Sequence, residues 1–193
     1  MSQEPEQRPS AWQSYSAPVG LAVLVVAAAA LAWNDSRSVN AVNASYATVR
    51  AARDCVATFA ATAPEEAALR ALRGELEGVV SSEGRAQATP LFELLGREEI
   101  QRGARTNVAM ALALLARLEL LEGDLEGAAQ AAQRYERETE DDLVPAEVEA
   151  WVWRVNELVV HPRAREVDRA GLRAALFAER RLTEVWPGAP KTD

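Results

Sequence analysis

An uncharged apolar run near the N-terminus limits what this chain can fold into. Residues 17–33 (APVGLAVLVVAAAALAW) are almost wholly apolar, and no charged residue occurs between Arg8 and Asp35. As a helix these residues extend about 26 Å, which is near the short end of what crosses ~30 Å of hydrocarbon. A helix that is apolar all round does not suit the surface of a globular domain. We therefore predict a single transmembrane anchor over residues 17–33, preceded by a polar tail at residues 1–16.

The residues that flank this run suit the ends of a membrane helix. Ser16 can cap its N-terminus, and Pro18 lies in the first turn, where a missing N–H costs little. Trp12, Tyr15 and Trp33 flank the run as interfacial aromatic residues do. The anchor residues predicted from the run are Val19, Leu21, Val23, Leu24, Val25, Val26, Leu31 and Trp33.

Two other interpretations of the run remain open. Ala30-Leu31-Ala32 fits a small-x-small cleavage site, so the run could be a signal peptide and the mature chain an exported soluble binding protein. The run could also be a buried helix of a soluble domain.

The abundant Ala and the 20 Arg against one Lys indicate a GC-rich bacterial source. Because short N-terminal tails usually stay in the cytoplasm, we expect an inner-membrane protein with its soluble part in the periplasm.

Residues 34–188 are expected to form an all-α soluble domain, followed by a short tail at residues 189–193. Ala, the strongest helix former, is abundant, and β-branched and aromatic residues are sparse after residue 34. Apolar residues recur every three or four positions, and no run alternates with period two. Asp35 or Ser36 can cap the first helix. The expected helices cover about 38–61, 64–80, a short segment from Pro90, 104–121, 124–138, 145–160 and 164–186.

One segment resembles a known family. Residues 109–132 (AMALALLARLELLEGDLEGAAQAA) place a Gly-Asp turn between two helical patterns with small residues at Ala116, Ala128 and Ala132. Over 109–142 this segment resembles one tetratricopeptide repeat, an antiparallel helix pair of about 34 residues. The sequence departs from the family pattern at Glu119, where an aromatic residue is usual, and at Glu140, where Pro is expected. No clear second copy is present, so neighbouring helices must complete the fold.

The resemblance implies protein binding on a concave helical surface lined by the first helix of the pair. It makes Arg105, Asn107, Met110 and Arg117 candidate partner contacts. Trp151 and Trp153 are about 200° apart on one helix, so both cannot face one core. They and Trp186 are further candidates for partner binding, because buried aromatic residues often dominate interfaces.

The sequence offers little for catalysis or for cofactor binding. His161 is the only histidine and Cys55 the only cysteine, so neither has a companion at the spacing that a metal site needs. The acidic residues 136–142 lack the ligand spacing of a calcium loop. The net charge of −8 and the absence of a basic stripe disfavour nucleic-acid binding. We expect no enzyme activity, no cofactor, no metal and no small-molecule substrate. The sequence instead indicates a scaffold or assembly subunit whose partners are other membrane-complex subunits and the lipid bilayer.

Overall fold

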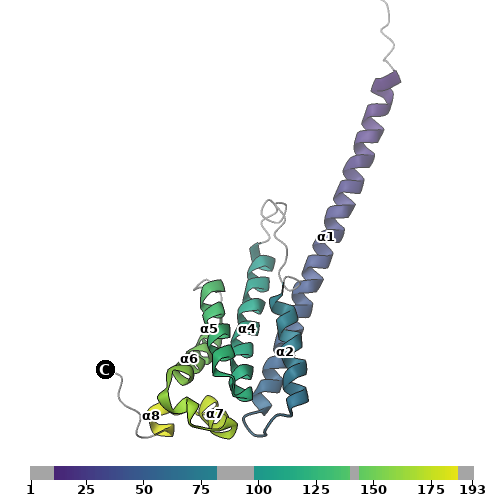
Figure 1. Ribbon diagram of the computed structural model, residues 1–193. Helices are drawn as coiled ribbons and strands as arrows, with labels where there is room; N and C mark the ends of the chain where they lie inside the picture. Colours follow the sequence, from purple (N-terminus) through teal and green to yellow (C-terminus); the bar gives the residue numbers. More distant parts are fainter. Residues whose placement is uncertain (1–10, 82–97, 140–143, 187–193) are drawn as a thin grey trace, which may run out of the picture. The chain divides into compact units, whose positions relative to one another are not determined.

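The computed structural model describes residues 11–81, 98–139 and 144–186, without the side chains of residues 11–21, 35, 98–100 and 183. Its contacts divide the chain into two units, Met1–Val39 (unit 1) and Asn40–Asp193 (unit 2). The described residues are helical and contain no strand, which confirms the all-α prediction (Figure 1). The helices are α1 (Ala11–Thr58), α2 (Glu66–Val80), α4 (Glu98–Glu122), α5 (Leu125–Glu138), α6 (Ala146–Val160), the 3₁₀ helix η1 (Pro162–Arg165), α7 (Arg169–Leu176) and α8 (Leu182–Val185). The short helix predicted from Pro90 falls outside the described residues.

α1 corrects the prediction of two separate helices in this part of the chain. It runs through residues 34–38, where we had expected Asp35 or Ser36 to cap a new helix. The hydroxyl of Ser38 donates to the carbonyl of Asn34 at 3.1 Å, one turn back along the helix. A serine bonded in this way leaves the helical backbone intact. No Gly or Pro occurs between residues 21 and 63 to interrupt the helix.

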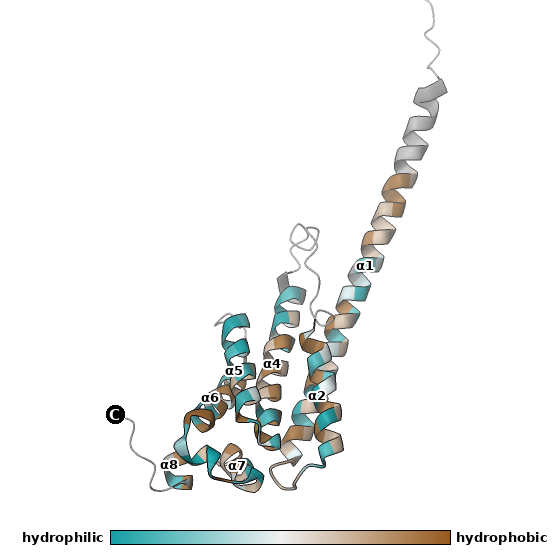
Figure 2. Ribbon diagram, in the orientation of Figure 1, coloured by the Kyte–Doolittle hydropathy of each residue, from teal (hydrophilic) through white to brown (hydrophobic). Residues whose placement is uncertain are grey.

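Unit 1 contributes one helical segment with exposed apolar side chains. Val23, Leu24, Val25 and Val26 are each at least 60% exposed, and Trp33 is 71% exposed. Figure 2 shows a largely apolar, brown stretch of α1 directly after the grey part of this helix. A single helix cannot bury its own surface, so unit 1 by itself offers these side chains no core. Among the residues whose side chains the structure describes, no helix meets the length and apolarity needed to cross a membrane.

α4 forms the centre of unit 2. From Val108 to Leu118 no residue is more than 9% exposed, so this part of the helix is covered on every side. α4 packs against α2, α5, α6 and α7, and the core also includes Val49, Ala52 and Val56 of α1. Eight of the ten residues in LALLARLELL (112–121) are Leu or Ala, which explains this central position, because such a helix needs neighbours on most of its faces.

α4 and α5 form the predicted hairpin. Gly123 has φ +83°, the left-handed conformation in which glycine commonly ends a helix. Asp124 then caps α5, because its side chain accepts a hydrogen bond of 2.8 Å from the N–H of Gly127. Ala116 and Ala128 are both fully buried, and α4 and α5 pack together. The Gly-Asp turn and the helix pair that it joins are therefore confirmed.

The left-handed turn gives a stability prediction. A residue with a side chain at position 123 would have to adopt an unfavourable positive φ. Its Cβ would also lie 3.3 Å from the Arg169 side chain. We expect Gly123→Ala to lower the free energy of unfolding by about 1–2 kcal/mol. Gly78→Ala is the matched control, because that glycine lies inside α2 with open space around it, and alanine there should add up to about 1 kcal/mol. Urea denaturation followed by circular dichroism measures both, and equal effects would contradict the prediction.

The C-terminal region corrects the prediction of one helix over residues 164–186. The chain there forms η1, α7 and α8 with turns between them. Asp168 starts α7 anew, since its Oδ1 accepts a 2.8 Å hydrogen bond from the N–H of Gly171. After α7, the carbonyls of Ala178 and Arg180 both accept hydrogen bonds from Arg154 of α6. These carbonyls are satisfied by a side chain from another helix, so they do not need to continue a helical ladder.

Candidate ligand-binding pocket

The structure separates the predicted partner contacts into three groups. Arg105 and Trp153 are exposed, and Trp153 is 63% exposed. Asn107 and Met110 are buried, as is Trp186, whose ring lies 5.0 Å from that of His161. The remaining two, Arg117 and Trp151, lie together at one pocket.

Burial in the core corrects the expectation that α4 lines an open groove. The side-chain amide of Asn107 donates to the carbonyl of Val42 at 3.0 Å, which ties α4 to the part of α1 in unit 2. Met110 is only 8% exposed. Both residues therefore stabilise the packing of α4, and neither presents a surface to a partner.

Of the predicted anchor residues, Val19 and Leu21 fall outside the described side chains. The other six, Val23, Leu24, Val25, Val26, Leu31 and Trp33, are all exposed.

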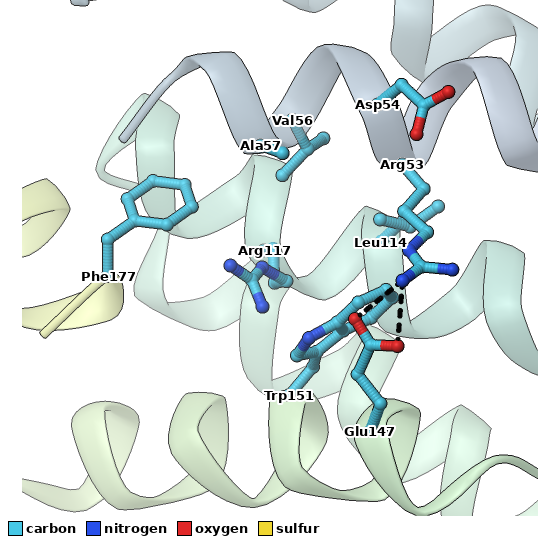
Figure 3. A pocket seen from close by; sticks show the side chains of 9 residues that line it. All are labelled: Arg53, Asp54, Val56, Ala57, Leu114, Arg117, Glu147, Trp151 and Phe177. Atoms are coloured by element: carbon cyan, nitrogen blue, oxygen red, sulfur yellow. Dashed lines mark hydrogen bonds and ion pairs between the residues drawn. The ribbon is translucent and has the colours of Figure 1, made fainter. Parts of the chain in front are cut away.

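Arg117 lies between two aromatic rings inside unit 2. Its Cζ is 5.1 Å from the ring centre of Trp151 and 5.0 Å from that of Phe177 (Figure 3). Rings at this distance attract a guanidinium ion. α4 supplies the arginine, α6 supplies Trp151, and Phe177 follows directly after α7. Three segments separated in sequence therefore hold one buried cation.

A second arginine closes another side of the pocket. Nη2 of Arg53 donates to both carboxylate oxygens of Glu147, each at 2.9 Å. The Cζ of Arg53 also lies 5.7 Å from the ring centre of Trp151. The pair is about half exposed, with side-chain exposures of 45% and 50%, so it adds little to stability. Its structural effect is to direct the Glu147 carboxylate toward Arg53.

These residues enclose a pocket of about 330 Å³. We call it the Arg117 pocket; its lining consists of Arg53, Asp54, Val56, Ala57, Leu114, Arg117, Glu147, Trp151 and Phe177. Arg117 is only 9% exposed, and its Nε is buried with no hydrogen-bond partner. Within the described part of the chain, no hydrogen bond from its guanidinium is found. Burial lowers the pKa of Arg117 from its ordinary value to about 10, against the opposing effect of the Glu147 charge.

This arrangement suits binding better than catalysis. At neutral pH Arg117 remains protonated, so it can donate hydrogen bonds and cannot act as a base. Neither His161 nor Cys55 lines the pocket. Nδ1 of His161 accepts a hydrogen bond from the N–H of Arg163 at 3.3 Å, and Cys55 is half-buried in α1 against the core. In the described part of the chain, no cluster of three His, Cys, Asp or Glu residues could hold a metal ion.

The sequence offered no way to find Arg53, Glu147 and Phe177 as parts of one site. They lie on α1, on α6 and after α7, and none belongs to a motif of fixed spacing. The position of an arginine within an apolar helical run was the one available signal, since Arg117 follows LALLA and precedes LELL. A charged residue at a core position of such a helix is unusual, because arginine is rarely buried without a partner.

Removal of the buried charge should stabilise unit 2. We expect Arg117→Met to raise the free energy of unfolding by about 1–3 kcal/mol at neutral pH, because a buried charge without a hydrogen-bonding partner is costly. The lowering of the pKa of Arg117 to about 10 corresponds to a penalty on the order of a few kcal/mol, which the aromatic contacts partly offset. Because the unfolded chain binds this proton more tightly, the penalty is complete below pH ~10 and shrinks as the pH rises above it.

Urea denaturation at about pH 7 and about pH 10.5 measures the stability and its pH dependence. Arg134→Met is the control, since Arg134 is paired with Glu138 on the surface of α5 at 2.7 Å. We expect it to change stability by less than about 0.5 kcal/mol. A loss of stability in Arg117→Met would show that the guanidinium has a favourable partner in the folded chain.

Comparisons with known proteins assign no family and no function to this chain. A scan of protein-family models finds no match to the chain, and searches of curated proteins and of solved structures find none. The function must therefore be argued from the residues themselves.

Proposed function

We propose that this protein is a non-catalytic, single-pass membrane-anchored helical scaffold that serves as an accessory or assembly subunit of a membrane protein complex. The exposed apolar segment of unit 1 carries this proposal. Val23, Leu24, Val25 and Val26 are consecutive, and each is at least 60% exposed. The surrounding sequence has no charge from residue 9 to residue 34. Such a surface is stable only against lipid or against other apolar helices.

The absence of charge over residues 17–33 favours lipid, rather than partner helices alone, as the cover of this segment. Lipid covers all faces of a helix at once, and residues 17–33 have no polar face for water to solvate. Partner helices would cover one side and could use the small residues Gly20, Ala22 and Ala27 for close packing. In a bacterial inner membrane, we place unit 2 on the periplasmic side.

The scaffold part of the proposal rests on the surface of unit 2. Trp153 is 63% exposed and Val160 is 79% exposed. They are seven residues apart on α6 and thus lie on one face of that helix. An exposed tryptophan beside an aliphatic residue is the kind of surface that anchors protein interfaces. The α4–α5 hairpin, with its resemblance to a tetratricopeptide repeat, is consistent with a protein-binding role.

Membrane fractionation of the full-length protein tests the anchor. We expect the protein to remain in the membrane pellet after an alkaline carbonate wash, and unit 2 to be digested by protease added to spheroplasts. N-terminal sequencing separates the anchor from a cleaved leader, since cleavage after Ala32 would give a chain that starts at Trp33. Recovery of the intact chain in the soluble fraction would show that the anchor is wrong.

Co-purification in mild detergent tests the scaffold role. We expect defined membrane proteins to elute with the wild-type protein, and Trp153→Ala to reduce their recovery. Tyr46→Ala is the control, because Tyr46 is also an exposed aromatic residue of unit 2, at 52%, but lies on α1. A monomer without partners would contradict the scaffold role and leave the anchor to be judged by fractionation.

A further inference from the structure

The proposed scaffold function does not make use of the Arg117 pocket. We propose that it binds a small carboxylic acid with a compact apolar body, whose carboxylate pairs with the guanidinium of Arg117. This inference concerns unit 2 alone and does not depend on the membrane anchor.

The first argument comes from the unmet bonding capacity of Arg117. The side chain is more than nine-tenths buried, its Nε has no partner, and it is protonated at neutral pH. Figure 3 shows its guanidinium between the side chains of Trp151 and Phe177. Buried cations in proteins are normally paired with an anion. The charge of Glu147 acts on Arg117, but no acceptor is bonded to Nε of Arg117. A bound carboxylate would accept two parallel N–H bonds from the guanidinium.

The second argument is that the chain's own carboxylates do not fill this role. Both oxygens of Glu147 accept hydrogen bonds from Arg53 at 2.9 Å. Asp54 also lines the pocket, but it is exposed, and Figure 3 shows its carboxylate pointing away from Arg117. Arg117 therefore remains available to an anion that enters from outside.

The third argument concerns which anion fits. The one buried guanidinium of the lining matches one planar carboxylate, whereas a phosphate dianion carries more charge and needs more donors. The charges of Glu147 and Asp54 also disfavour a dianion. The rest of the lining is largely apolar, with Val56, Leu114 and two aromatic rings. The volume of about 330 Å³ is at the lower end of the range for ligand pockets, which favours a small molecule.

Calorimetric titration of the full-length protein in mild detergent tests the proposal. Benzoate is the probe, and benzamide is its uncharged counterpart of the same shape. We expect saturable 1:1 binding of benzoate and at least tenfold weaker binding of benzamide. Inorganic phosphate should not bind. The indole N–H resonance of Trp151, assigned with Trp151→Phe, should shift during the benzoate titration.

Variants of Arg117 locate the binding energy. Arg117→Met should weaken benzoate binding at least tenfold, and Arg117→Lys should weaken it too, because lysine keeps the charge but loses the planar fork. Arg134→Met, the surface control, should bind benzoate like the wild type. If Arg117→Met did not fold, Arg117→Lys and the comparison of benzoate with benzamide on the wild-type protein would still decide the matter.

The Glu side chain of a polypeptide is a second possible source of a carboxylate ligand. Acetyl-glutamate amide carries that side chain on a polar backbone, and we expect it to bind at least tenfold more weakly than benzoate.

Several results would overturn the proposal: no saturable benzoate binding up to about 10 mM, equal binding of benzamide, binding of phosphate, wild-type affinity in Arg117→Met, or acetyl-glutamate amide binding as tightly as benzoate. None of these results bears on membrane fractionation, so the two proposals fail separately.

Discussion

The double substitution Leu24→Arg with Val26→Arg should move most of the protein out of the carbonate-resistant membrane pellet. Both side chains are exposed, at 68% and 69%, and lie near the middle of the apolar run 17–33. Each arginine near the centre of a membrane helix costs about 2.5–3.5 kcal/mol on insertion scales. Two together cost about 5–7 kcal/mol, which changes the partition between membrane and water by more than a thousandfold.

The matched control for this experiment is Tyr46→Arg. Tyr46 lies on the same helix, α1, and is 52% exposed, but it belongs to unit 2. A charge there should leave the membrane fraction unchanged, since that part of the helix already carries the charged residues Arg50, Arg53 and Asp54. Retention of the double-arginine variant in the washed membranes would rule out lipid contact at these positions. It would then point to a protein partner that holds the chain there.

The second large effect is expected for Leu118→Ala in the centre of α4. Leu118 is fully buried in a helix that packs against α2, α5, α6 and α7. Loss of a buried leucine side chain leaves a cavity and typically costs about 2–5 kcal/mol. For a domain with a total stability of about 5–15 kcal/mol, this is a large share. We expect unit 2 to unfold at clearly lower urea concentration.

Val160→Ala provides the comparison for this substitution. Val160 is 79% exposed on α6, so its shortening should change the free energy of unfolding by less than about 0.5 kcal/mol. Circular dichroism at increasing urea concentration measures both variants. A loss below about 1 kcal/mol for Leu118→Ala would mean that α4 is not the centre of a well-packed core.

The segment that resembles a tetratricopeptide repeat forms the expected helix hairpin but only part of the expected groove. The pattern over 109–132 predicted a helix hairpin, and α4 and α5 form one. The further expectation of a groove lined by the first helix is wrong for Asn107 and Met110, because both side chains are buried in the core of unit 2. Arg117 is the exception, since a pocket opens beside it. The family resemblance therefore supports a hairpin and leaves the binding surface to be argued from the geometry.

Local signals in the sequence predicted most helix boundaries to within a few residues. Expected helices at 64–80, 124–138 and 145–160 correspond to α2, α5 and α6. Their ends depend on Pro64, on the Gly123-Asp124 turn and on Pro145, whose effects act within one turn of the chain. The all-α character followed in the same way, from high helix propensity and a three-to-four residue period.

Other features depended on contacts that no local pattern records. The break of the last predicted helix depends on Arg154, which binds the carbonyls of Ala178 and Arg180 from another helix. The Arg117 pocket depends on Arg53, Glu147 and Phe177, which lie far apart in the chain. Helix periodicity determines which face of a helix is apolar, but only packing determines which residues of different helices meet. For that reason the sequence alone determined the fold class and most of the helices, and the tertiary structure decided where the Arg117 pocket lies.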